Sequence, residues 1–169
     1  MSANRIPDPT LMARLEISGE DVEWAASLVR PWQHEEREGH WSPHAQVWHL
    51  LDVERSNYQP RITRILNEDR PIFQPIHAEA RLREHYDASP GIDDLARQFA
   101  EERAKTVGLF KGLTPEQWQR TGVWPDGREI DLAWLAERAL WHALEHFASL
   151  LAVHQEFEPR QSLRWIVSP

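Results

Sequence analysis

The chain has 169 residues, which fits a single domain (residues 1–169, with a core expected over about 11–157) that needs no disulfides for stability. It contains no cysteine, which excludes disulfides, thiolate metal ligands and a cysteine nucleophile. The net charge of −8 and the lack of a Lys/Arg run argue against a nucleic-acid partner. No signal-peptide pattern or long uncharged apolar stretch is visible, so we expect a soluble, cytoplasmic protein with no membrane partner.

Local signals predict two helices in the first half of the chain. The first is expected over about 18–29, where apolar residues recur at helical spacing. The second is expected over about 42–67, because its Ser-Pro start supplies an N-cap and a proline at the first helical position. Pro60 should kink or divide this helix, since proline lacks the N–H that an inner turn needs. A proline-rich link over 71–90 follows.

The second half predicts two more helices, over about 93–112 and from about 131 to just before Pro159. Residues 114–118 (TPEQW) are typical of a single capped turn, and residues 124–128 (WPDGR) of a turn between two short extended pieces. Four long helices with long crossover connections and little strand signal predict an all-α fold, an antiparallel four-helix bundle.

Two histidines lie one turn apart on the last predicted helix. At about 100° per residue, the side chains of His142 and His146 are about 40° apart around the helix axis. They share that sector with residues of core type such as Leu135 and Val153. Two buried imidazoles need partners for their ring nitrogens, and a metal ion would meet that need.

A third ligand should come from a facing helix, because metal sites in bundles are built from side chains on opposed helices. His49 is the best candidate, since Ala45 and Val53 place it on the small, apolar inner stripe of the second helix. The remaining histidines are expected at the surface or in loops: His34, His40, His44, His77, His85 and His154.

Neighbouring polar and aromatic residues allow two interpretations each. Asp52 would either hydrogen-bond an imidazole of the site or face substrate, or, as we expect, pair with an arginine of a neighbouring helix. Glu145 is expected to be an edge charge. The tryptophans Trp48, Trp134 and Trp141 are expected in the bundle core rather than in a pocket.

The last predicted helix also carries a second apolar face. It lies about 140–180° from the histidines and consists of Ala136, Leu140, Leu144, Phe147 and Leu151. Either a neighbouring helix of the same chain or a second subunit must cover this face. We expect a homodimer built partly from this helix, since isologous pairs are the commonest oligomers.

Two motifs resemble the DinB/YfiT-like superfamily. The segment 41–55 (WSPHAQVWHLLDVER) resembles its second-helix motif, and residues 142–146 (HALEH) resemble its fourth-helix motif. The resemblance implies a four-helix bundle, often dimeric, with a divalent metal held by His49, His142 and His146. The Gly-Gln pair often found after the last histidine is replaced by residues 147–150 (FASL), so details of the pocket do not carry over.

Several members of that superfamily are S-transferases or isomerases that use glutathione, bacillithiol or mycothiol. The resemblance therefore favours a divalent-metal enzyme, with Zn, Ni, Fe or Mn as the ion, an external low-molecular-weight thiol as cosubstrate and a small-molecule substrate. Three neutral imidazoles leave open positions on an ion, which suits catalysis. The alternatives are a metal-dependent hydrolase, a non-catalytic metal-binding stress-response protein, and a purely structural dimeric bundle.

Overall fold

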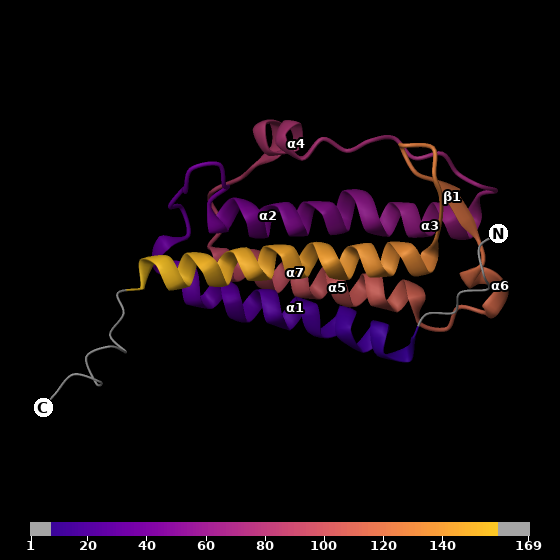
Figure 1. Cartoon of the computed structure of the whole chain (residues 1–169), viewed down its shortest axis with the longest axis horizontal. Helices are drawn as coiled ribbons and strands as arrows, with labels where there is room; N and C mark the ends of the chain where they lie inside the picture. Colours follow the sequence, from indigo (N-terminus) through magenta and orange to yellow (C-terminus); the bar gives the residue numbers. More distant parts are fainter. Residues whose placement is uncertain (1–7, 159–169) are drawn as a thin grey trace, which may run out of the picture.

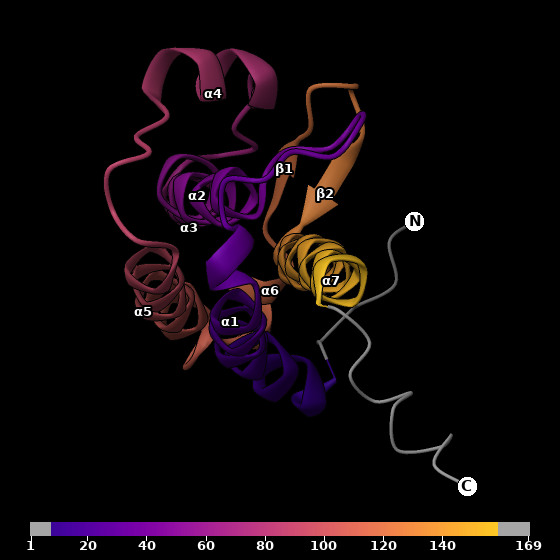
Figure 2. The same cartoon turned by 90° about the vertical axis from the view of Figure 1, so that its left-hand side faces the viewer.

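The computed structural model describes residues 8–158, and four long helical rods form its body (Figures 1 and 2). Three rods are single α-helices and one is composite: α1 (Pro9–Val29), α2 (Pro43–Val53) continued through a π-helical segment (Glu54–Tyr58) into α3 (Gln59–Asn67), α5 (Ile92–Phe110) and α7 (Leu132–Phe157). Seen end on in Figure 2, the four rods lie side by side around one axis. The predicted all-α four-helix bundle is confirmed.

The sequence predicts an antiparallel bundle, and this is wrong for some neighbours: not all adjacent rods run in opposite directions. Figure 1 shows that the chain leaves α3 at one end of the bundle and returns along its whole length before α5 begins. As a result α5 runs parallel to α2 and α3, which it packs against, and α7 runs parallel to its neighbour α1. The long crossover connection makes this possible, because parallel neighbours need a connection that spans the bundle.

α1 begins at Pro9 rather than near residue 18. The Asp8 carboxylate caps it by accepting from the Thr10 N–H, and proline occupies the first turn. Ser42 does the same for α2, where its hydroxyl accepts from the Ala45 N–H. The Asp8-Pro9 pair therefore carried the same start signal as the Ser-Pro pair of the second helix, and only the latter was recognised.

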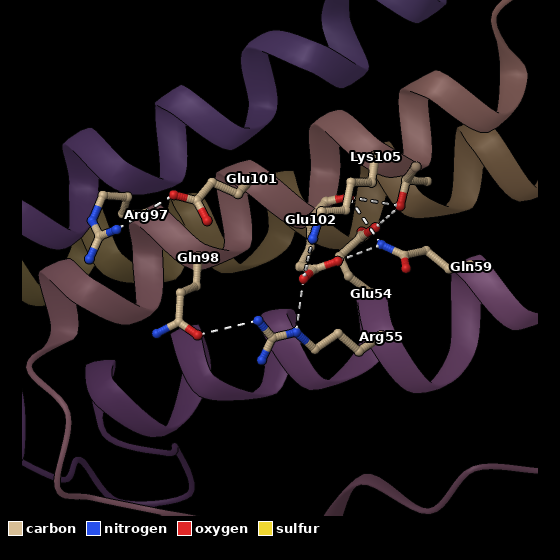
Figure 3. A network of polar contacts seen from close by, with 9 residues as sticks. Glu54, Arg55, Gln59, Arg97, Gln98, Glu101, Glu102 and Lys105 are labelled. Carbon is tan, nitrogen blue, oxygen red and sulfur yellow. Dashed lines mark hydrogen bonds and ion pairs between the residues drawn. The ribbon is translucent and has the colours of Figure 1, made fainter.

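The helix around Pro60 is widened instead of broken. Residues Glu54–Tyr58 form a π-helical segment, and the Gln59 N–H donates to the Glu54 carbonyl. A wider turn is tolerated here because Pro60 has no N–H to give to the preceding turn. Figure 3 shows the result on the side facing α5: the side chains of Arg55 and Gln59 reach Glu102.

A buried ion pair lies beside these contacts. Glu54, in the π-helical segment, pairs with Arg103 of α5 over 2.7 Å, and both side chains are 1% exposed. The Thr106 hydroxyl donates to the second carboxylate oxygen of Glu54. Because each partner would be left charged and buried without the other, this pair fixes the register of α5 against the composite rod.

The crossover over 71–90 contains an eight-residue helix, α4 (Ala78–His85), which the sequence analysis missed. Its residues are mostly strong helix formers (AEARLREH), but the prolines on either side suggested a plain link. α4 lies outside the bundle over α2, and Arg81 makes a bidentate contact with Asp52 of α2. The crossover therefore forms a cover over one side of the second rod.

The connection from α5 to α7 follows the prediction closely. α6 (Pro115–Trp118) is a single turn with a complete capping box, and β1 (Thr121–Val123) pairs antiparallel with β2 (Glu129–Asp131). The Asp131 carboxylate then caps α7 by accepting from the Trp134 N–H. None of the helices in the described part of the chain has an apolar stretch long enough to span a membrane.

The second apolar face of α7 is covered largely by α1 of the same chain. Ala136 and Leu140 are buried with Leu15 of α1 in one core cluster. Trp141, expected in the core, is instead 62% exposed, because it lies at the edge between this face and the histidine side of the helix. Trp48 is buried as expected, and Trp134 is partly buried against that core cluster.

Candidate metal centre

Three histidines from two rods meet at one point of the bundle. His49 of α2 and His142 and His146 of α7 each offer a ring nitrogen, and these atoms lie within 4.8 Å of one another. The Nε2 atoms of His49 and His142 are 3.2 Å apart. The sequence predicts that these three side chains converge, and the structure brings them together.

The spacing of the nitrogens fits a shared metal ion. Imidazole nitrogens lie about 2.0–2.1 Å from zinc, so two of them on one tetrahedral ion are about 3.3 Å apart. Ligands at right angles on an octahedral ion would be about 2.9 Å apart by the same trigonometry. The observed 3.2 Å between His49 and His142 falls between these values. This pair is therefore spaced as two ligands of one divalent ion would be.

Burial keeps all three imidazoles neutral. It lowers the pKa of His142 to about 2, helped by the positive charges that His146 and His49 would carry. Burial also lowers the pKa of His49 to about 4, against the opposing effect of Asp52, and that of His146 to about 4. Neutral imidazoles keep a free lone pair at pH 7, which is the form that binds a metal.

Gln46 fixes the orientation of His146. Its side-chain nitrogen donates to the Trp41 carbonyl over 2.9 Å, so its oxygen, Oε1, faces the Nδ1 of His146 at 3.2 Å. An oxygen can only accept, so Nδ1 must carry the proton and Nε2 is left with the lone pair. His142 has no such acceptor: its Nδ1 is buried and makes no hydrogen bond within residues 8–158.

The contact of Gln46 with His146 was not predicted, although the position of Gln46 in the sequence indicates it. Gln46 precedes His49 by three residues and therefore shares its face of α2. Asp52 follows His49 by three residues, and both of its carboxylate oxygens accept from Arg81. Of the interpretations weighed for Asp52, the structure contains the pairing with an arginine, which comes from the crossover helix α4.

The expectation that all other histidines lie at the surface is wrong for His44. Its side chain is fully buried, with Nδ1 2.7 Å from the Tyr86 hydroxyl and Nε2 2.7 Å from the Pro90 carbonyl. Burial lowers the pKa of His44. Through these two contacts, His44 connects the end of the crossover to α2. His34, His40, His77 and His85 are exposed, and His154 pairs with Glu158 on the surface of α7.

A cavity of about 430 Å³ opens beside the three histidines. Its wall includes Trp41 and Glu79 on one side and Arg138 and Glu145 on the other. The indole N–H of Trp41 donates to Glu79, and Arg138 lies 3.5 Å from Glu145. Glu145 is exposed, as expected for an edge charge, and it lies on the rim of the cavity. All three histidines of the cluster line this cavity.

The chain belongs to the DinB superfamily, whose family model matches residues 14–150. Its fold is similar to that of YfiT from Bacillus subtilis, described as a probable metal-dependent hydrolase with an unusual four-helix bundle topology. That likeness has a TM-score of 0.81 at 20% identity and covers 92% of each chain.

A DinB-like protein from Bacillus subtilis is also similar, with a TM-score of 0.58 at 16% identity over 90% of this chain and 94% of that one. A comparison with curated proteins gave no match. At these identities the two structural likenesses establish the fold and leave the chemistry to be argued from the site.

Proposed function

We propose that this protein is a divalent-metal-dependent enzyme with His49, His142 and His146 as its metal ligands. The observation that carries the proposal is the convergence of three neutral imidazoles, with 3.2 Å between the Nε2 atoms of His49 and His142, beside an open cavity of about 430 Å³. Three protein ligands with space beside them are typical of catalytic sites, whereas structural sites are closed by a fourth protein ligand. The open cavity thus favours an enzyme over a purely structural or storage role.

The reaction that the site supports best is transfer of an external low-molecular-weight thiol to a small molecule. A bound divalent ion would supply a Lewis acid that lowers the pKa of a thiol or a water molecule. A thiol, with an ordinary pKa of about 8.5, needs a much smaller shift than water to ionise at pH 7. Asp52 is engaged by Arg81 and Glu79 by Trp41, while Glu145 in the cavity wall is an exposed carboxylate 3.5 Å from Arg138.

The thiol must come from outside, because the chain has no cysteine. Glutathione, bacillithiol and mycothiol are the candidates, and Zn, Ni, Fe or Mn the candidate ions. Such thiols are kept reduced in the cytoplasm, so the proposal includes a cytoplasmic site of action. Hydrolysis is the second candidate function, favoured by the likeness to YfiT, whose description is that of a probable metal-dependent hydrolase.

The test is conjugation of each thiol to an electrophile such as monochlorobimane, with and without added metal. Activity should require metal, disappear with a chelator and be lost in His146→Ala. A matched control is His85→Ala, which removes an exposed histidine of α4. Turnover that survives both chelation and His146→Ala would refute the mechanism. Turnover of ester or amide substrates, with none of any thiol, would establish the second candidate in its place.

We also propose a homodimer that uses the α1 and α7 side of the bundle. Ile17 and Trp141 are 51% and 62% exposed and line a common cavity between these helices. Trp24, 55% exposed, continues the surface along α1. Apolar side chains of this size gather at interfaces more often than on free surfaces. Light scattering should give twice the chain mass for the wild type and the monomer mass for Trp141→Glu; a monomeric wild type at micromolar concentration would contradict the proposal.

A further inference from the structure

A cationic side chain lies in the wall of the cavity next to the histidine cluster. Arg138 precedes His142 by one turn of α7 and lines the same cavity as His142 and His146. Its positive charge contributes to the lowered pKa of both histidines, after the larger effect of burial. The guanidinium therefore acts electrostatically on the place where a metal ion would bind.

The ion pair of Arg138 leaves most of its hydrogen-bonding capacity unused. The nearest atoms of Arg138 and Glu145 are 3.5 Å apart, longer than the 2.7–2.9 Å of a charge-assisted hydrogen bond. The Glu145 side chain is 63% exposed, so water screens the pair further. A guanidinium has five donors arranged as a fork that fits a carboxylate. A ligand in the cavity can accept from Arg138 without having to displace a strong partner.

The charges in the cavity wall require an anion when a metal is present. The wall contains the carboxylates of Glu79 and Glu145 and the guanidinium of Arg138, while the three histidines of the cluster are neutral. A divalent ion added to these groups leaves one excess positive charge. Two cations that share a partly enclosed site repel each other unless an anion lies near both. An anionic group beside Arg138 relieves this repulsion.

We propose that the substrates of this cavity carry a carboxylate, which Arg138 binds while the reacting group of the same molecule lies at His49, His142 and His146. A carboxylate matches the fork of the guanidinium, and its single charge matches that of Arg138. A phosphate, with nearly two charges, would be repelled more strongly than a carboxylate by Glu145 in the same cavity wall. This inference rests on the proposed function, because it takes the histidines as metal ligands.

The test uses the Co²⁺-substituted protein, whose visible spectrum changes when a ligand reaches the metal. Two probes are titrated: 3-mercaptopropionate and its neutral amide, 3-mercaptopropanamide. We expect the acid to bind the wild type about tenfold more tightly than the amide, as for a charge-assisted pair at a partly exposed site. In Arg138→Gln the two probes should bind about equally. Arg97→Gln, an exposed arginine of α5, should keep the wild-type preference.

The outcomes separate the two proposals. Equal binding of acid and amide to the wild type, or a preference that persists in Arg138→Gln, overturns the inference and leaves the thiol proposal standing. If neither thiol changes the spectrum, the thiol proposal fails, and 3-aminopropionate and its amide, whose amine can reach the ion, replace the probes. A preference for the acid that depends on Arg138 would then support the carboxylate site, and no such preference would overturn it. Absence of bound Co²⁺ would overturn both.

Discussion

Gln46→Leu tests whether the hydrogen bond to His146 prepares the site for metal. Leucine fills nearly the same volume but cannot accept from the Nδ1 of His146, 3.2 Å away in the wild type. A hydrogen bond to a group that becomes partly charged is worth about 1.5–3 kcal/mol, or roughly 10- to 100-fold in an equilibrium constant. Partners behind a metal ligand typically change metal affinity by about the same factor.

The assay is competition for Zn²⁺ with a chromophoric chelator at pH 7. We expect Gln46→Leu to bind Zn²⁺ about 10- to 100-fold more weakly than the wild type. Gln46→Glu, which keeps an acceptor toward His146, should retain most of the affinity. Gln155→Leu, an exposed glutamine of α7, is the control. The reasoning would be refuted if Gln46→Leu bound Zn²⁺ like the wild type, or if the control lost as much.

Three further predictions concern the frame around the site. Glu54→Ala leaves Arg103 buried without its partner and should lower the free energy of unfolding by about 3–5 kcal/mol in a urea titration; a change below 1 kcal/mol would contradict the role given to the pair. Burial lowers the pKa of His44, so below its ordinary value of 6.5 the unfolded chain takes up this proton more readily than the folded chain, and stability falls as the pH drops. We expect His44→Gln to reduce the pH dependence of the free energy of unfolding by up to about 1.4 kcal/mol per pH unit between pH 6.5 and 5, measured with metal removed by a chelator. An unchanged slope would contradict this effect of His44. Gly122→Ala would place its Cβ 2.6 Å from the Phe73 ring, so we expect a loss of about 1–3 kcal/mol in the same urea assay, and a neutral effect would show that Phe73 is free to move.

The parts of the structure that followed from the sequence are those with local signals. The capping box of α6, the Asp-Gly turn between the strands and the start of α7 near residue 131 each depend on a few neighbouring residues. The convergence of the histidines was also predictable. Helical spacing places His142 and His146 on one face of α7, and the stripe of small residues places His49 on the inner face of α2. The resemblance of segments 41–55 and 142–146 to two family motifs, in the family's order, supported the same three histidines.

The parts that did not follow depend on contacts between distant segments. Nothing near His44 in the sequence indicates that Tyr86 and Pro90 will surround it and bury it. The π-helical segment before Pro60 likewise contains a residue with a distant partner, because Glu54 pairs with Arg103 of α5. The parallel course of α5 is set by the crossover as a whole, and helical periodicity carries no information about direction.

The central claim is that His49, His142 and His146 together bind one divalent ion. Its most direct test is metal content per chain, measured by mass spectrometry after saturation with Zn²⁺ and removal of the excess, for the wild type, each single His→Ala variant and the His85→Ala control. We predict one ion per chain in the wild type and control, and a large loss in each of the three variants. Full occupancy in any of the three variants, or equal loss in the control, would contradict the assignment.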